Sequence, residues 1–219
     1  MPTEPIRPLK DVWLRPRRVF RDMAARPVGI IDYLLAAAQG IGDFLALYRT
    51  EGPDTHRGVE EILGNSLAYG AVAGVASLFL MAAIYRRLGA RAGGKSTTPQ
   101  VIHVLAYGSV PLAASLAIWM LTALLAGEAA FVDTPRPDVE GFVVLLLHLQ
   151  VISYVLLLIW SIVLQVMGFS EIQGMATRKA FGLWVLGQII GFLVSLFLAL
   201  IIEALFPGLL LHIIPQHRP

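Results

Sequence analysis

The chain has no cysteine. Disulfide bonds, thiolate metal sites and cysteine nucleophiles are therefore excluded. Charged residues are also scarce: they make up 15% of the 219 residues, whereas hydrophobic residues make up 57%. A soluble domain of this length carries more charge, so the composition indicates a single membrane domain.

Two long stretches carry no charged side chain at all. They cover residues 142–167 and 181–202, which is 26 and 22 residues. A helix rises about 1.5 Å per residue, so each stretch is longer than the hydrocarbon core of a bilayer, which is about 30 Å thick. We therefore predict an all-α, polytopic integral membrane protein, a helical bundle whose last two helices form a transmembrane hairpin over residues 142–206.

Two earlier segments also have the length and composition of membrane spans, at residues 62–85 and 101–126. In the first, Gly70 and Gly74 form a small-residue pair that permits close contact with another helix. In the second, Pro111 removes a backbone hydrogen bond, so a bend is expected there.

Residues 28–48 form a weaker segment. Asp32 and Asp43 enclose only ten uncharged residues, fewer than a spanning helix needs. Two structures fit this pattern: a tilted helix covered by protein, or a re-entrant segment that bends at Gly40 and Gly42. If the segment crosses, the chain has five transmembrane segments.

Residues 1–27 lack the apolar core of a signal peptide, so we do not expect cleavage. Within them, Val19, Phe20 and Met23 share one face of a helix, and arginines occupy the other face. This pattern predicts an amphipathic helix at the membrane interface; the alternative is a solvated basic tail that only sets the topology. The basic residues expected to contact lipid headgroups are Arg17, Arg18 and Arg21.

Basic residues are distributed unevenly about the predicted spans. With five crossings and a cytoplasmic N-terminus, the cytoplasmic segments hold 13 of the 17 Lys and Arg residues and the external segments hold four. This bias fits the positive-inside rule. The predicted organisation is therefore a cytoplasmic segment at 1–27, a five-span membrane domain at 28–207 and an external tail at 208–219.

Several short motifs follow one another along residues 12–207. The motifs are Trp13-x-x-Pro16-x-x-x-Phe20, Pro27 ahead of the first span, Gly93-Gly94, Tyr107-x-x-x-Pro111, the series Trp160, Leu164, Gly168 and Phe169, and Lys179-Ala180. In this order and spacing, the chain resembles the Yip-domain family, five-span membrane proteins named for their interaction with Rab-type GTPases.

The resemblance implies a non-enzymatic protein that acts in membrane organisation or as an adaptor or scaffold. The short basic N-terminus resembles prokaryotic members, which implies a bacterial inner (plasma) membrane with the N-terminus in the cytoplasm. The D-L-Y-G-P motif of eukaryotic members is missing, so we do not expect this chain to bind a Rab-type GTPase. Membrane lipids are the expected partners, with anionic lipids on the cytoplasmic face. Two further kinds of partner stay open: a second copy of this chain, or another membrane protein.

The chain contains the sequence pattern of a nucleotide-binding motif, but not the secondary structure that this motif requires. Gly89-x-x-x-x-Gly94-Lys95-Ser96 fits the P-loop pattern. A working P-loop follows a buried strand and opens a helix whose amides hold phosphate. Here the motif follows a membrane helix, so a basic loop facing anionic headgroups explains it better. We expect no cofactor and no nucleic-acid partner.

Polar residues inside the spans are a sharper functional signal, because burying them in lipid is costly. Asp43, His148 and Glu203 come from three different spans, and all fall in the outer half of the bilayer. They predict a shared site for a proton or a divalent cation such as zinc. The alternative is that the two carboxylates reach headgroup water while His148 bonds a backbone carbonyl.

A second polar set lies nearer the cytoplasm and is expected to hold helices together rather than to bind a ligand. The second set comprises Asp32, His103, Tyr107, Gln165 and Gln188.

No Ser-His-Asp order, metalloprotease motif or paired carboxylate spacing is visible, so an enzyme is not expected.

The favoured hypothesis for function is a membrane-organising or adaptor protein. The alternative is a transporter or channel for a small cation, lipid or other solute that uses the outer cluster, and an intramembrane lipid enzyme is third. A sealed bundle favours the first hypothesis, whereas a water-filled cavity that reaches Asp43, His148 and Glu203 favours the second.

Overall fold

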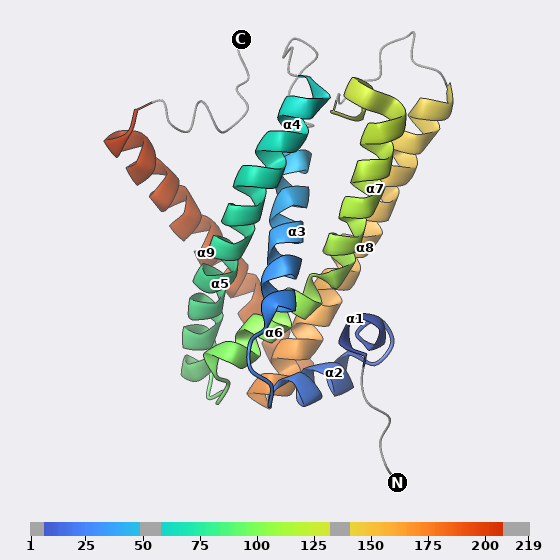
Figure 1. The fold of residues 1–219 in the computed structure, drawn as a ribbon. Helices are drawn as coiled ribbons and strands as arrows, with labels where there is room; N and C mark the ends of the chain where they lie inside the picture. The colour runs from blue at the N-terminus through green and yellow to red at the C-terminus, as the bar shows by residue number, and fades with distance from the viewer. Residues whose placement is uncertain (1–6, 49–57, 132–140, 208–219) are drawn as a thin grey trace.

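The computed structural model describes residues 7–48, 58–131 and 141–207, and helices are the only regular structure in these ranges. Five helical segments among them are long and apolar enough to cross a membrane, which confirms the predicted all-α bundle (Figure 1). The segments are α3 (Ile30–Tyr48), the series α4–η1–α5 (Val59–Asn65, Ser66–Gly70 and Ala71–Arg91), the pair α6–α7 (Thr98–Gly108 and Val110–Ala126), α8 (Gly141–Gln173) and α9 (Thr177–Leu205).

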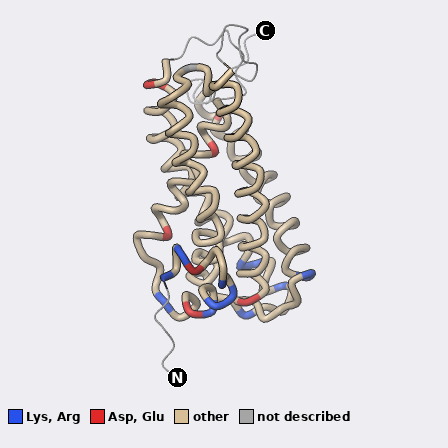
Figure 2. The backbone as a smooth tube through the Cα atoms, turned by 90° about the vertical axis from the view of Figure 1, so that its right-hand side faces the viewer, with Lys and Arg blue, Asp and Glu red and all other residues tan. Residues whose placement is uncertain are grey.

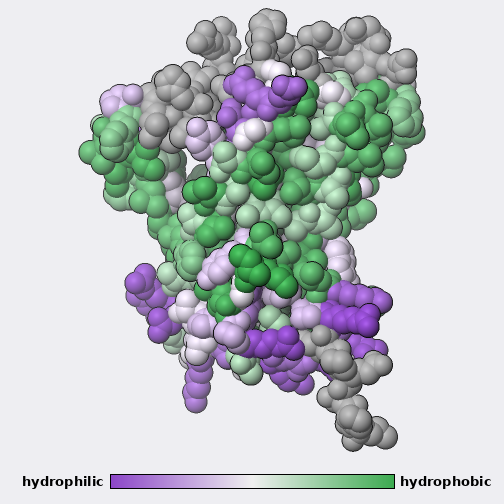
Figure 3. All heavy atoms as spheres, in the orientation of Figure 1, coloured by the Kyte–Doolittle hydropathy of each residue, from purple (hydrophilic) through white to green (hydrophobic). Residues whose placement is uncertain are grey.

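Two short helices, α1 (Pro8–Asp11) and α2 (Pro16–Met23), lie at one end of the bundle (Figure 1). Every Lys and Arg of the described residues lies at this end, which we call the basic end (Figure 2). We call the opposite end the far end. On the face drawn in Figure 3, the surface between the two ends is mainly apolar, as a bilayer requires.

The segment that the sequence left open, residues 28–48, forms one continuous helix. α3 has 19 residues and passes through Gly40 and Gly42 without a break, so it is about 28 Å long at 1.5 Å per residue. It packs against α5, α6 and α7. The re-entrant alternative, with a bend at Gly40 and Gly42, is therefore wrong: the segment is one straight-through helix packed against its neighbours.

Glycines bring α3 and α5 close together. A Cβ at Gly40 would lie 2.6 Å from the Cα of Gly74, and a Cβ at Gly70 would lie 2.8 Å from the carbonyl oxygen of Gly40. Backbone therefore meets backbone at this crossing, as the Gly70 and Gly74 spacing predicts. The π-helical turn η1 ends at Gly70, within the same contact.

The third span breaks where Pro111 predicts a bend. α6 ends at Gly108 and α7 begins at Val110, with Ser109 between them. Proline lacks the amide hydrogen that a continuous helix would use here, and its ring displaces the preceding turn. A neighbouring helix contacts the break directly, since the Ser161 hydroxyl of α8 donates to the Gly108 carbonyl oxygen at 2.8 Å.

The last helix leaves the bundle partway along its length. Its buried residues, Ala180, Leu183, Gly187 and Gly191, all lie in the half nearer the basic end. There Gly187 faces the ring of Tyr85 on α5, and the Tyr85 hydroxyl donates to the Trp184 carbonyl oxygen at 3.0 Å. No residue of α9 beyond Gly191 is buried, and α9 leans away from α5 toward the far end (Figure 1).

Candidate functional site

The N-terminal amphipathic helix forms as predicted, but its apolar face packs on protein. Val19, Phe20 and Met23 of α2 are 0%, 1% and 4% exposed and belong to the core of the bundle. The Phe20 ring lies over Gly168 of α8, beside Val104 of α6. The expectation that this face is buried in the membrane interface is therefore corrected. An amphipathic pattern does not distinguish lipid from a protein groove, since both are apolar.

Two of the three predicted headgroup arginines also join α2 to the bundle. Arg21 Nε donates to Glu171 Oε1 of α8 at 2.7 Å, and Arg17 Nη2 donates to Thr177 Oγ1 of α9 at 3.0 Å. The hydrogen bond to Glu171 raises the pKa of Arg21 above its ordinary value. These contacts fix the polar side of α2, while the core fixes its apolar side.

The third arginine, Arg18, has an ion-pair partner on its own helix: its Nε lies 3.8 Å from Asp22 Oδ2. The side chain of Arg21 remains 70% exposed despite its bond to Glu171. Arg17 is exposed as well. Contact of these arginines with lipid phosphates therefore stays a prediction, compatible with their place at the basic end.

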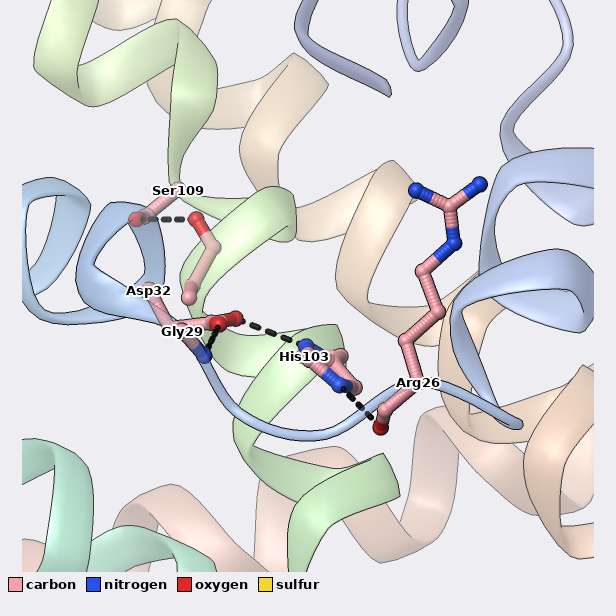
Figure 4. Close-up of polar contacts among 6 residues, drawn as sticks. Arg26, Gly29, Asp32, His103 and Ser109 are labelled. Atoms are coloured by element: carbon pink, nitrogen blue, oxygen red, sulfur yellow. Dashed lines mark hydrogen bonds and ion pairs between the residues drawn. The ribbon is translucent and has the colours of Figure 1, made fainter. Parts of the chain in front are cut away.

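A buried, hydrogen-bonded His–Asp pair holds the linker between α2 and α3 (Figure 4). His103 Nδ1 of α6 lies 2.7 Å from Asp32 Oδ1 of α3, and both side chains are 2% exposed. His103 Nε2 lies 3.1 Å from the Arg26 carbonyl oxygen, and the Gly29 amide donates to Asp32 Oδ2 at 2.9 Å. The first turn of α6 adds a further contact, since Gln100 Nε2 donates to the Ala24 carbonyl oxygen at 3.2 Å.

Hydrogen-bond chemistry restricts the protons of this pair. A carbonyl oxygen only accepts, so Nε2 of His103 carries a hydrogen and donates to Arg26. One further proton lies between Nδ1 and the Asp32 carboxyl group. Both groups are fully occupied by protein partners, which leaves no free position for a ligand. Asp32 and His103 therefore tie helices together, as the sequence predicts.

The other members of that polar set divide between two roles. Gln165 is a tie, because its Oε1 accepts a hydrogen bond from Trp184 Nε1 at 2.9 Å and so links α8 to α9. The Tyr107 ring lies 6.3 Å from the His103 ring, measured between centroids. Gln188, in contrast, is exposed and lines a cavity.

The predicted outer cluster is not formed. Among the described residues, no three His, Asp or Glu side chains lie close enough to hold a metal ion. His148 is exposed, and its Nδ1 donates to the Val144 carbonyl oxygen of its own helix at 2.7 Å, as the alternative interpretation has it. The far ends of α8 and α9 lie on opposite sides of the bundle (Figure 1), so His148 and Glu203 are separated. A similar predicted depth along the spans does not fix lateral position.

Asp43, the remaining member, lines a cavity of about 290 Å³ inside the bundle. α3, α5, α6, α8 and α9 all contribute to its wall. The side chain of Gln39, one turn earlier on α3, hydrogen-bonds to the Asp43 carboxylate. The polar side chains that reach the cavity and are not buried are Gln39, Asp43, Ser77, Gln188 and Ser195.

Our sequence analysis missed three of these cavity residues: Gln39, Ser77 and Ser195. Helical spacing carried a usable signal, because Gln39 lies four residues before Asp43 and Ser195 lies seven residues after Gln188. Both spacings place two polar side chains on one face of an otherwise apolar helix. Ser77 had no such companion on its own helix.

These features define a polytopic, all-helical membrane protein with a protein-docked N-terminal helix and a polar cavity between its spans. The sequence model described as the Yip1 domain matches residues 10–201. The chain therefore belongs to the Yip1 domain family. Neither the curated proteins nor the solved structures contain a match to it.

Proposed function

We propose that this protein is a non-enzymatic membrane organiser that works as an adaptor or scaffold from its basic end, facing the cytoplasm. One observation carries the proposal: every described Lys and Arg gathers at the end where α2 docks (Figure 2). Positive charge next to membrane spans favours the cytoplasmic side. Membership of the Yip1 domain family supports a role within the membrane.

The basic end presents its charges to the headgroup region. Arg86, Arg87 and Arg91 at the end of α5 are exposed, as are Lys95 and Arg178. Each basic side chain near an anionic surface contributes about 1 kcal/mol, and the contribution decreases with salt. Several such residues at one end of the bundle therefore favour anionic lipids around this end of the protein.

The experiment measures which lipids the protein retains. The full chain is reconstituted in nanodiscs of phosphatidylcholine and phosphatidylglycerol, and native mass spectrometry counts the lipids that remain bound. We expect a preference for phosphatidylglycerol that weakens with salt. The triple change Arg86→Gln, Arg87→Gln and Arg91→Gln should reduce this preference about tenfold or more.

The matched control keeps the charge and changes the side chain: Arg86→Lys, Arg87→Lys and Arg91→Lys should retain most of the preference. Equal retention of the two lipids by the unchanged protein would refute the proposed role of the basic end.

A transporter of a small cation, lipid or other solute is the second candidate, and the cavity is the observation that favours it. All of its lining residues lie within the five membrane-length segments. It reaches Asp43, but neither His148 nor Glu203 is among its lining residues. The cavity therefore provides a binding chamber, and passage across the membrane would require a second conformation.

A further inference from the structure

The cavity between the spans has an uneven chemical character. It contains one carboxylate, that of Asp43, and no Lys, Arg or His is found among the described residues that line it. Around the carboxylate lie uncharged groups that can accept hydrogen bonds: the amide oxygens of Gln39 and Gln188 and the hydroxyl oxygens of Ser77 and Ser195.

These polar side chains differ from those that hold the helices together. The helix ties are buried: Asp32 is 2% exposed, Ser161 1% and Gln165, which also borders the cavity, 7%. Ser77, Gln188 and Ser195 are instead exposed, although they lie within the membrane-length segments. Polar groups at this depth are costly when they face lipid chains. Filling the cavity with a polar ligand would remove that cost.

The lining selects a positively charged hydrogen-bond donor. A carboxylate taken out of water without a counter-ion is strongly unfavourable, and the lining provides no cationic side chain. An anionic ligand would be repelled by Asp43. A divalent cation prefers several charged or carbonyl oxygens, and no group of three acidic or His residues is present in the described ranges. A primary ammonium group has one positive charge and three N–H donors, which match one carboxylate surrounded by neutral acceptors.

Size and access both favour a headgroup. The volume of about 290 Å³ is several times the roughly 30 Å³ of a water molecule, so the cavity holds a small organic cation. Phe192 lines the cavity and is 68% exposed. It lies directly after Gly191, the last buried residue of α9. The cavity is therefore adjacent to the point on α9 beyond which no residue of this helix is buried.

We propose that this cavity binds a primary alkylammonium group with Asp43 as its counter-ion, the group being the headgroup of an amine-bearing phospholipid that enters beside α9. A soluble amine has the same chemistry, so the experiment must distinguish the two sources. This proposal does not depend on the proposed role of the basic end. The protein can bind an amine at Asp43 without preferring phosphatidylglycerol, and it can prefer phosphatidylglycerol without binding an amine at Asp43.

The experiment uses the full chain in detergent with defined lipids. Native mass spectrometry measures the affinities for phosphatidylethanolamine and phosphatidylcholine, and calorimetry measures the affinity for ethanolamine in solution. Phosphatidylcholine is the matched lipid because its trimethylated nitrogen has no N–H donor. We expect phosphatidylethanolamine to bind at least about tenfold more tightly than phosphatidylcholine, as a charge-assisted hydrogen bond implies.

Variants locate the site. Asp43→Asn should abolish the preference, and Asp43→Glu should retain part of it. Glu203→Gln removes a carboxylate of α9 that is not among the lining residues, so it should have no effect. Ser195→Leu fills the cavity from an exposed position on α9 and should also weaken binding, which provides a second test if Asp43→Asn does not fold.

Each result has a defined meaning. Asp43-dependent binding of ethanolamine without lipid preference would support the ammonium site and assign it to soluble amines. Equal binding of the two lipids together with no binding of ethanolamine would overturn the proposal. An amine preference that survives both Asp43→Asn and Ser195→Leu would overturn it as well.

Discussion

Phe20 of α2 and Gly168 of α8 are in such close contact that a Cβ at Gly168 would lie 3.1 Å from the Phe20 ring and 2.7 Å from a Val104 methyl group. Phe20 comes from the N-terminal segment and Gly168 from the fourth span. Their contact makes α2 a part of the folded bundle. Both residues belong to the motifs by which the chain resembles the Yip-domain family, so those motifs meet in space.

The first prediction concerns this contact. Gly168→Ala should destabilise the protein by about 1–3 kcal/mol, the usual cost of overpacking a filled site. It should also release α2, so trypsin should cleave faster within residues 15–26 in detergent. Gly182→Ala is the matched control, because a Cβ at Gly182 has nothing within 4 Å. Equal effects of the two changes would contradict the packing role of Gly168.

The second prediction concerns the crossing of α3 and α5. Gly40→Ala places a Cβ against the backbone of Gly70 and Gly74, and backbone cannot rotate away as a side chain can. We expect a loss of stability of about 3 kcal/mol or more, at the upper end of overpacking effects. The midpoint temperature of unfolding in detergent measures it.

Gly42→Ala, two residues further along α3, is the control, since nothing lies within 4 Å of a Cβ there. It should be neutral or slightly stabilising, because alanine favours a helix more than glycine does. A large effect of Gly42→Ala would mean that glycine flexibility, and not close packing, matters in α3.

The third prediction separates the two aspartates of α3. Asp32→Asn leaves the buried His103 without its carboxylate partner and should destabilise the fold by about 1–3 kcal/mol. His103→Ala should have a similar effect, and the double change should cost less than the sum because the two residues share one interaction. Asp43→Asn should change stability little, since its side chain faces the cavity. Thermal unfolding of the four variants decides between a structural tie and a ligand site.

The spans and their contacts could be predicted because a bilayer imposes strict requirements. The charge-free runs at 142–167 and 181–202 had to be helices long enough to cross. Pro111 had to interrupt its span because it has no amide hydrogen. Gly70 and Gly74 indicated a close crossing, and Gly40 completes it.

The remaining features depend on three-dimensional placement. The apolar face of α2 has the same pattern whether it meets lipid or the groove around Gly168. Depth in the bilayer grouped His148 with Glu203, but lateral position separates them. The cavity at Asp43 depends on how far α9 leans from its neighbours, which packing along the whole helix determines.

The central claim is that the basic end of a five-span bundle faces the cytoplasm, and cysteine labelling of intact cells tests it most directly. The chain has no native cysteine, so each introduced cysteine reports one position. A reagent that does not cross the membrane should label Thr55→Cys and Asp133→Cys, which lie outside the described residues in the loops predicted to be external. It should not label Ser96→Cys, between α5 and α6 at the basic end, until the cells are opened. Labelling of Ser96→Cys in intact cells, with Thr55→Cys and Asp133→Cys protected, would contradict the account.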